Sequence, residues 1–210
     1  MPGVTISAGY GAGGSVIAPQ VARLLGFPLL DRAISSRVAE QLRVSVAEAE
    51  GGTIRRSLPD RFIGALAPLA AGLLAMGTDT APNELTPGDD ADLFRERAEA
   101  VMRAALQDGA VILGRAGGAA FRAEPRVLRV RLFGPAAARS AQAARIEDVD
   151  EPTARRRLPE VDKARAQYVR RLYRADIDDP DLYHLHIDST ALPLGICAEQ
   201  IVAAYRALTG

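Results

Sequence analysis

Two hydrophobic periods alternate along the chain. Short apolar runs, typical of strands, cover residues 4–7, 27–30, 110–114, 127–133 and 184–188. Between them, apolar residues recur at every third or fourth position, as on one face of a helix, over 16–25, 34–46, 60–76, 91–107, 135–174 and 194–208. Helices that alternate with strands in this way predict a parallel α/β sheet of about five strands, with helices on both faces.

Glycine and proline punctuate the helical patterns. Gly26 ends the first helix, and Pro19 in its second turn is expected to kink that helix or delay its start. The long helical stretch is expected to break near Pro159. Residues 77–90 have the Gly, Pro, Asp and Thr content of a mobile loop, after which Asp90 can cap the next helix. No internal repeat is visible, so we expect a single domain over 1–210.

Composition narrows the class of partner. The chain has 210 residues, of which 48% are hydrophobic, enough for a full core. Its net charge is zero, which argues against nucleic acid or an anionic membrane as partner and favours a small molecule. We find no leader and no apolar run long enough to span a membrane, and therefore expect a cytoplasmic protein. With Cys197 alone no internal disulfide forms, and the sequence leaves homo-oligomer formation open.

The first strand and first helix are joined by a glycine-rich turn, SAGYGAGGS, at residues 7–15. Such turns hold phosphates because backbone N–H groups point outward where the helix begins. From Gly9 the turn fits the G-x-G-x-x-G pattern of dinucleotide-binding folds, and Asp31 follows where an acidic residue would hold a ribose. From Ala8 it fits a phosphate loop that lacks its first glycine and, at Gly14, its lysine.

Two features favour the phosphate loop. Residues 32–109, mostly helical in pattern, separate Asp31 from the next strand, which is too long for the crossover of a dinucleotide fold. The segment 135–174 is rich in arginine, which suits the neutralisation of a transferred phosphoryl group and has no role in hydride transfer. Lys163 is the only lysine among 26 basic residues, and we interpret it as an ordinary surface pair with Asp162.

Several motifs in order carry a resemblance to a known family. They are ISAGYGAGGSVIAPQVARLLGFPLLDR at 6–32, VILGRAGG at 111–118, VDKARAQYVRRLYRADIDDPDLYHLHIDST at 161–190 and the closing amphipathic helix. The chain resembles the cytidylate kinase-like family, a branch of the P-loop nucleoside monophosphate kinases. The resemblance implies a three-layer P-loop kinase fold, with 33–108 as a helical acceptor-binding lobe and 135–176 as an arginine-rich lid. It also implies ATP as the phosphoryl donor and Mg²⁺ as its companion ion.

The resemblance also assigns roles to individual residues. It implies that ATP binds to the loop at Gly11, Ala12, Gly13, Gly14 and Ser15. It implies a substrate-binding role for Asp31, Arg37 and Arg115, and a catalytic role in the lid for Arg165, Arg170 and Arg171. Asp31 and Arg37 match the spacing of the family's acceptor-site motif, in which the arginine holds the acceptor phosphate. Arg115 matches a family arginine that lies beside the acceptor base.

The loop departs from the family pattern. Ala8 stands where the family usually has arginine, Gly9 where it has glutamate, and Ser15 where arginine is common. The loop therefore offers backbone donors and a hydroxyl but no cation, so either arginines from elsewhere supply the charge or the reaction is slow. The aspartate that usually follows the arginine at 115 is Ala116, which leaves the choice of a pyrimidine base open.

The leading hypothesis is phosphoryl transfer from ATP to a nucleoside monophosphate such as CMP or dCMP. A weakly catalytic nucleotide-binding regulator and a dinucleotide-dependent oxidoreductase are the alternatives. His184, His186 and Asp188 alternate along one strand, but neighbours on one strand face seldom converge on one ion, so we expect no metal site built by the protein alone. Mg²⁺ needs only one or two protein oxygens, such as the Ser15 hydroxyl.

Overall fold

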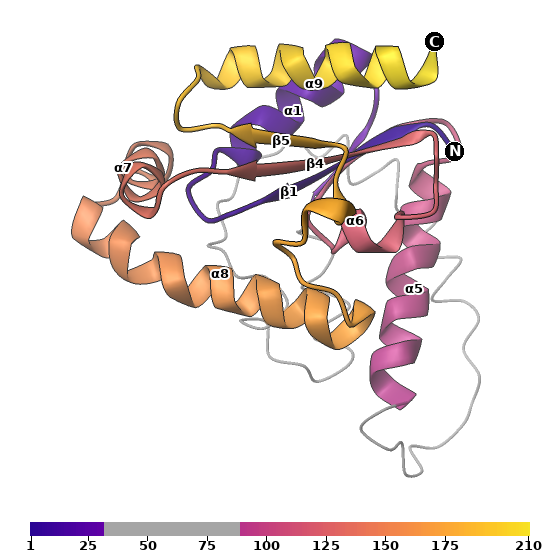
Figure 1. Ribbon diagram of the computed structural model, residues 1–210, viewed down its shortest axis with the longest axis horizontal. Coiled ribbons are helices and arrows are strands. Elements are labelled where there is room, and N and C mark those ends of the chain that lie inside the picture. Colours follow the sequence, from indigo (N-terminus) through magenta and orange to yellow (C-terminus); the bar gives the residue numbers. More distant parts are fainter. Residues whose placement is uncertain (32–88) are drawn as a thin grey trace.

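The computed structural model describes residues 1–31 and 89–210, and its centre is a parallel sheet (Figure 1). The strands lie in the order β2-β3-β1-β4-β5, and every neighbouring pair is parallel. Their bounds are Gly3–Ala8 for β1, Leu29–Leu30 for β2, Ala110–Leu113 for β3, Val127–Phe133 for β4 and Leu185–Asp188 for β5. The five-stranded parallel α/β sheet predicted from the hydrophobic periods is confirmed.

Helices cover both faces of this sheet. Those near it are α1 (Gly14–Leu25), α5 (Asp89–Ala105), α6 (Gly117–Ala120) and α9 (Leu194–Thr209). Helices α1 and α9 lie together on one face, whereas α5 and α6 lie on the other (Figure 1). Because successive strand residues point to opposite faces, Val4 and Ile6 join the core under α1 and α9. Thr5, between them, faces Gly117 of α6.

The first helix begins directly after the glycine-rich turn. It starts at Gly14 and continues through Pro19, so the late start, one of the two effects expected of Pro19, does not occur. The N–H group that Pro19 lacks would have paired with the carbonyl of Ser15, and both residues are exposed, so water can take that bond. Gly26 ends the helix in the left-handed conformation, at φ 69°.

The arginine-rich segment forms a helical hairpin of α7 (Ala136–Glu147) and α8 (Glu151–Tyr173). The predicted break near Pro159 is wrong, because the chain turns ten residues earlier. Asp148 is left-handed at φ 54°, and Asp150 caps α8 by accepting the Thr153 N–H through its side chain. Pro159 lies inside α8 on an exposed surface, where water can pair with the carbonyl that loses its partner.

Several expectations fall outside the described residues. These are Arg37, the helix at 60–76, most of the loop at 77–90 and most of the acceptor lobe at 33–108. Of that lobe the structure describes α5, which begins at Asp89 rather than Ala91. Within the two described ranges, no helix has the length and apolarity needed to cross a membrane.

Candidate functional site

The glycine-rich turn has the backbone of an anion-binding loop. Gly11 and Gly13 have φ angles of 73° and 72°, in the left-handed region that glycine adopts without strain. The Ala12 N–H donates to the Gly9 carbonyl at 3.1 Å, which closes the turn. No acceptor within 1–31 and 89–210 takes the N–H groups of Gly11, Gly13, Gly14 and Ser15. These donors and the start of α1 suit a phosphate.

Side chains from distant elements hold the loop from outside. Gln142 of α7 donates to the Gly11 carbonyl at 2.9 Å, and the buried Ser189 hydroxyl donates to the Ala12 carbonyl at 2.7 Å. A Cβ at Gly11 would overlap the Arg139 carbonyl oxygen, and one at Gly13 would lie 2.7 Å from the Leu194 side chain. The loop therefore requires glycine at both positions for φ, and at Gly11 for space as well, because the obstacle there is backbone.

The helical hairpin brings two guanidinium groups onto the loop. Arg139 Nη1 of α7 donates to the Tyr10 carbonyl at 2.9 Å, and Arg165 Nη1 of α8 donates to the Ala8 carbonyl at 2.8 Å. Asp162 links Tyr10 to Arg139. Its Oδ1 accepts the Tyr10 N–H and its Oδ2 accepts a hydrogen bond from Arg139 Nη1, each at 2.7 Å. A loop without a cation of its own thus has two arginines at its start, one on Ala8 at the end of β1 and one on Tyr10.

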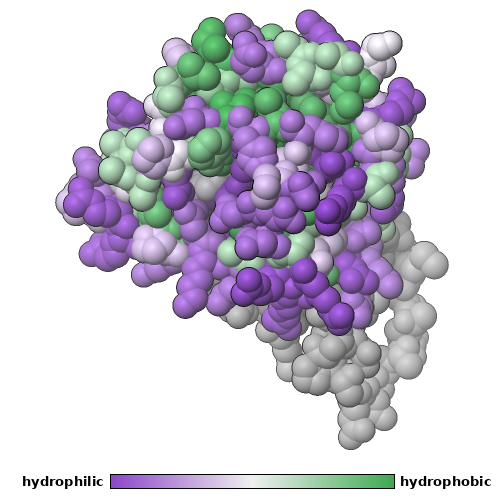
Figure 2. Space-filling view, in the orientation of Figure 1, coloured by the Kyte–Doolittle hydropathy of each residue, from purple (hydrophilic) through white to green (hydrophobic). Residues whose placement is uncertain are grey.

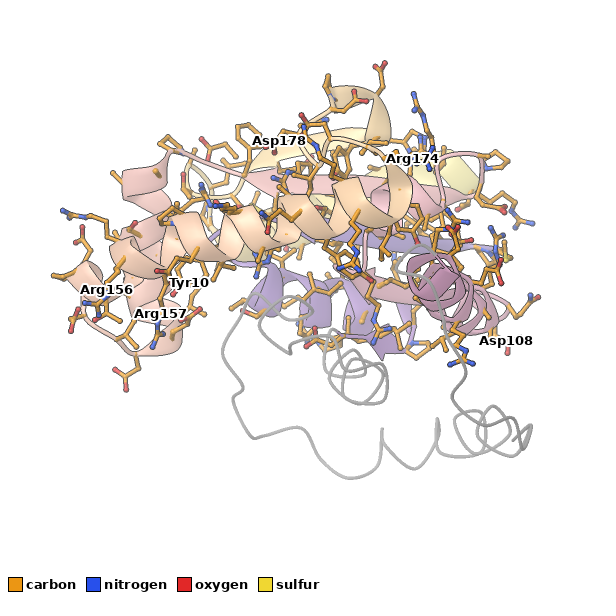
Figure 3. The ribbon with its side chains drawn as sticks, turned by 90° about the horizontal axis from the view of Figure 1, so that it is seen from below. Tyr10, Asp108, Arg156, Arg157, Arg174 and Asp178 are labelled. Atoms are coloured by element: carbon orange, nitrogen blue, oxygen red, sulfur yellow. The ribbon has the colours of Figure 1, made fainter. Side chains whose placement is uncertain are left out.

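A second set of contacts fixes the hairpin to Tyr10. The buried Tyr10 hydroxyl donates to Glu147 Oε2 at 2.8 Å, and Arg157 Nη1 donates to the same oxygen at 3.2 Å. Burial, followed by the carboxylate of Glu147, raises the pKa of Tyr10. Tyr10, Arg156 and Arg157 lie at the same end of the hairpin (Figure 3). Arg156 is exposed, and its Nη2 donates to the Thr153 hydroxyl at 3.4 Å rather than to Glu147.

A pocket of about 200 Å³ lies beside the loop. Ala8 and Gly9 form one wall, and the charged residues around it are Arg131, Arg139, Asp162, Arg165 and Asp178. Arg131 comes from β4, where its Nη1 donates to the Ser7 hydroxyl at 3.1 Å and its Nη2 to Asp178 Oδ1 at 2.6 Å. The visible face over α8 is mostly hydrophilic (Figure 2). Three arginines and two aspartates line the pocket, and this surplus of positive charge favours anionic ligands.

Two predicted substrate residues meet at the carboxyl ends of β2 and β3. The buried Arg115 side chain donates to the Asp31 carbonyl oxygen through Nη2 at 3.2 Å and Nε at 3.4 Å. Arg115 is left-handed at φ 55°, unusual for a residue other than glycine. Burial lowers the pKa of Arg115, whereas burial raises the pKa of the nearby Tyr168 to about 12 against the opposing charge of Arg115.

The predicted lid residues lie in different surroundings. Arg165 is on the loop, as described, whereas Arg170 and Arg171 are exposed in the last turns of α8. Arg37 is outside the described residues. Ser15, suggested as an oxygen ligand for Mg²⁺, is exposed in the first turn of α1.

Sequence reasoning missed three residues of this site. Arg131 carries a signal, because a strand that is otherwise apolar, VLRVRLF, contains arginines two positions apart and hence on one face. Asp162 does not form the surface pair expected with Lys163, since its carboxylate is taken by Tyr10 and Arg139. Arg139 has no local signal, because its partner loop lies more than a hundred residues earlier in the chain.

Comparisons with solved structures agree with the fold. A crystal structure of an uncharacterized protein from Eubacterium ventriosum ATCC 27560 matches with a TM-score of 0.65 at 16% identity, over 99% of each chain. A gluconokinase from Sinorhizobium meliloti 1021 matches with a TM-score of 0.52 at 13% identity, over 99% of this chain and 93% of the other. At such identities the likeness concerns the fold.

No curated protein matches the sequence. A family model does match it, and that match covers residues 3–191, which contain the loop, both arginine-bearing helices and all five strands. The chain therefore belongs to the cytidylate kinase-like family.

Proposed function

We propose that the protein transfers a phosphoryl group from ATP to a nucleoside monophosphate, with CMP or dCMP as the expected acceptor. One observation carries the proposal. The phosphate loop lacks a lysine, and two arginines of the α7–α8 hairpin lie at its start instead, at Tyr10 and Ala8. Family membership supports kinase chemistry in general, and the acceptor is inferred from the family pattern.

In this proposal the loop holds the phosphates of ATP. Gly11, Ala12, Gly13, Gly14 and Ser15 surround the start of α1, where N–H donors and the helix dipole favour negative charge. The exposed Ser15 hydroxyl is an oxygen donor of the kind that Mg²⁺ accepts, and this ion would lower the charge of the phosphates that it accompanies.

The hairpin supplies the cations. A phosphoryl group in transfer spreads negative charge over its equatorial oxygens, so a protein accelerates the reaction with cations aimed at them. Of the three predicted catalytic arginines Arg165 is placed best, since it lines the pocket, as Arg139 of the same hairpin does. Arg170 and Arg171 are exposed and would have to approach through movement of the lid, residues 135–176.

We place the acceptor at the carboxyl ends of β2 and β3, next to the loop that follows β1. Asp31 and Arg115 lie together there, and Arg37 follows Asp31 by six residues. We assign acceptor binding to these three residues and to the segment 33–108. The strand order opposes a dinucleotide site, because β3 separates β2, which Asp31 follows, from β1 and its loop. In a dinucleotide fold the strand with the acidic residue lies next to the first strand.

Purified protein with ATP, Mg²⁺ and each common nucleoside monophosphate tests the proposal. We expect diphosphate product from CMP or dCMP. Arg165→Ala should lower kcat by roughly 10²-fold, because it removes charge needed in the transition state. Arg37→Ala should chiefly raise KM for the monophosphate. Arg156→Ala is the control for Arg165→Ala, because Arg156 is an exposed arginine of the same helix, α8.

Failure has a clear form. If ATP binds but no monophosphate yields a diphosphate above the background of ATP hydrolysis, the kinase proposal is wrong. The protein would then be a nucleotide-binding regulator that retains the fold.

A further inference from the structure

Arg131 is a buried cation in the middle of a sheet, and such a charge requires partners. Its side chain is 11% exposed, and it reaches the pocket beside Ala8 and Gly9. Within the described ranges, the Ser7 hydroxyl and Asp178 take two of its hydrogen bonds. A guanidinium has five N–H donors, so this one has capacity for a further acceptor.

A neighbouring arginine shows what a structural role looks like in this strand. Arg129 lies two residues earlier on the same face, and it donates through Nε to the Leu182 carbonyl at 2.9 Å and through Nη1 to the Phe121 carbonyl at 3.3 Å. Both acceptors are backbone atoms fixed by the fold. Arg129 therefore ties elements together, with acceptors that a ligand cannot replace.

The carboxylate partner of Arg131 is of a different kind. The Asp178 side chain is 73% exposed and sits in the turn between α8 and the short 3₁₀ helix η1 (Pro180–Leu182). In Figure 3 Asp178 lies above the middle of α8, away from Tyr10 and Arg157. Because the Asp178 side chain is mostly exposed, it can return to water when another anion takes its place on Arg131.

We propose that Arg131 binds a phosphate oxygen of the substrate, and that Asp178 is its counterion only while the pocket holds no phosphate. The inference rests on the proposed function for the identity of the ligand, a nucleotide phosphate. The observation behind it is that one pocket contains Arg131, Arg139 and Arg165 together with the first residues of the loop. Arg131 would be a third cation, contributed by the sheet rather than by the lid.

The two members of the ion pair give opposite expectations. If Arg131 binds phosphate, Arg131→Met should weaken the binding of ATP or of CMP by about tenfold or more, since it removes a charge-assisted hydrogen bond. Asp178→Ala removes a competitor, so the affinity should stay equal or rise. If the pair is merely structural, both substitutions should weaken binding alike.

Calorimetry with ATP and with CMP in separate titrations, on the full chain and without turnover, measures these affinities. Arg145→Met, an exposed arginine of α7, controls for lost positive charge, and Asp181→Ala, an exposed aspartate of η1, controls for lost negative charge. The affinity of Asp178→Ala should equal or exceed that of Asp181→Ala. Should Arg131→Met fail to fold, the comparison of the two aspartate variants still decides the role of Asp178.

Unchanged affinity for both nucleotides in Arg131→Met overturns the inference. A loss in Asp178→Ala, relative to Asp181→Ala, overturns it as well. Because the readout is binding, the result is independent of turnover. If the wild-type protein forms no diphosphate but Arg131→Met binds nucleotide more weakly, the phosphate contact of Arg131 stands. Only the kinase proposal is then contradicted.

Discussion

Some positions of the phosphate loop require glycine, whereas others have a backbone conformation that any residue can adopt. Gly11 and Gly13 belong to the first group, because a side chain at either would be strained in φ and would meet a neighbour. Gly14 belongs to the second, since it is the first residue of α1 and is absent from the positive-φ glycines. The lysine of the usual phosphate loop is therefore missing for no reason of backbone geometry.

Gly14→Lys should restore the usual cation of the loop. We expect ATP to bind more tightly by ~1 kcal/mol, about fivefold, because an ammonium group would reach phosphates held by the same N–H groups. Calorimetry measures the change. Gln20→Lys adds the same charge one to two turns further along α1 and is the control. An affinity that stays constant or falls in Gly14→Lys would show that the loop does not hold phosphates in the proposed way.

At the scale of elements, the α7–α8 hairpin is built by its ends and by one buried cluster. Asp150 caps α8, and Pro152 occupies a first-turn position that lacks an N–H partner in any helix. Tyr10 packs with Ala143, Ala154 and Leu158 in a cluster between the two helices and the loop. The phosphate loop is therefore part of the core of the hairpin, so movement of one should be felt by the other.

Unlike Pro152, Pro159 lies inside α8, where proline is unfavourable. Proline in a helix interior costs about 3 kcal/mol relative to alanine, whereas in the first turn it costs little. Pro159→Ala should therefore raise the free energy of unfolding by as much as about 3 kcal/mol, and Pro152→Ala should leave it nearly constant. Urea unfolding of both variants checks this pair. Equal changes would mean that α8 is already distorted enough at Pro159 to absorb the proline.

At the scale of the whole molecule, sequence patterns could predict what depends on local periodicity. Every described strand was expected to within two residues, because buried strands read as apolar runs bounded by turns. The break before α8 was misplaced because proline is a strong local signal. The cap at Asp150 and the left-handed Asp148 are weaker signals.

The candidate site was harder to predict than the fold. The loop could be found because its glycines are contiguous, and Asp31 and Arg115 because both follow strands. Arg139 and Asp162 could not be singled out, since their significance arises from contacts with Tyr10 over more than a hundred residues of chain. Long-range pairing of this kind leaves no period in the sequence.

The packing of α8 against the rest of the molecule should be visible in the pH dependence of stability. Tyr168 of α8 is partly buried and packs on the cluster of Ala98 and Leu172, which joins α5 to α8. Burial raises the pKa of Tyr168 to about 12, and the guanidinium of Arg115 opposes the rise. The folded state thus keeps the phenol protonated at pH values where the unfolded chain, with a pKa near 10, releases the proton.

The sign follows from this difference. Between pH 10 and about 12 the folded protein binds more protons than the unfolded chain, so the free energy of unfolding falls as the pH rises through this window. Below pH 10 both states hold the proton, and Tyr168 adds no dependence on pH. In Tyr168→Phe the group cannot titrate, so its unfolding free energy should fall less steeply, by about 1 to 2 kcal/mol over the window.

Urea unfolding of both proteins between pH 8 and 11.5 measures the two slopes. Burial also raises the pKa of Tyr10 and Tyr183, so both proteins should lose stability and only the difference between them belongs to Tyr168. Absorbance of tyrosinate in the folded proteins gives an independent reading, since Tyr168→Phe should remove the phenol that titrates near pH 12. Parallel slopes would show that Tyr168 is solvated, and that α8 is not packed on α5 as the cluster indicates.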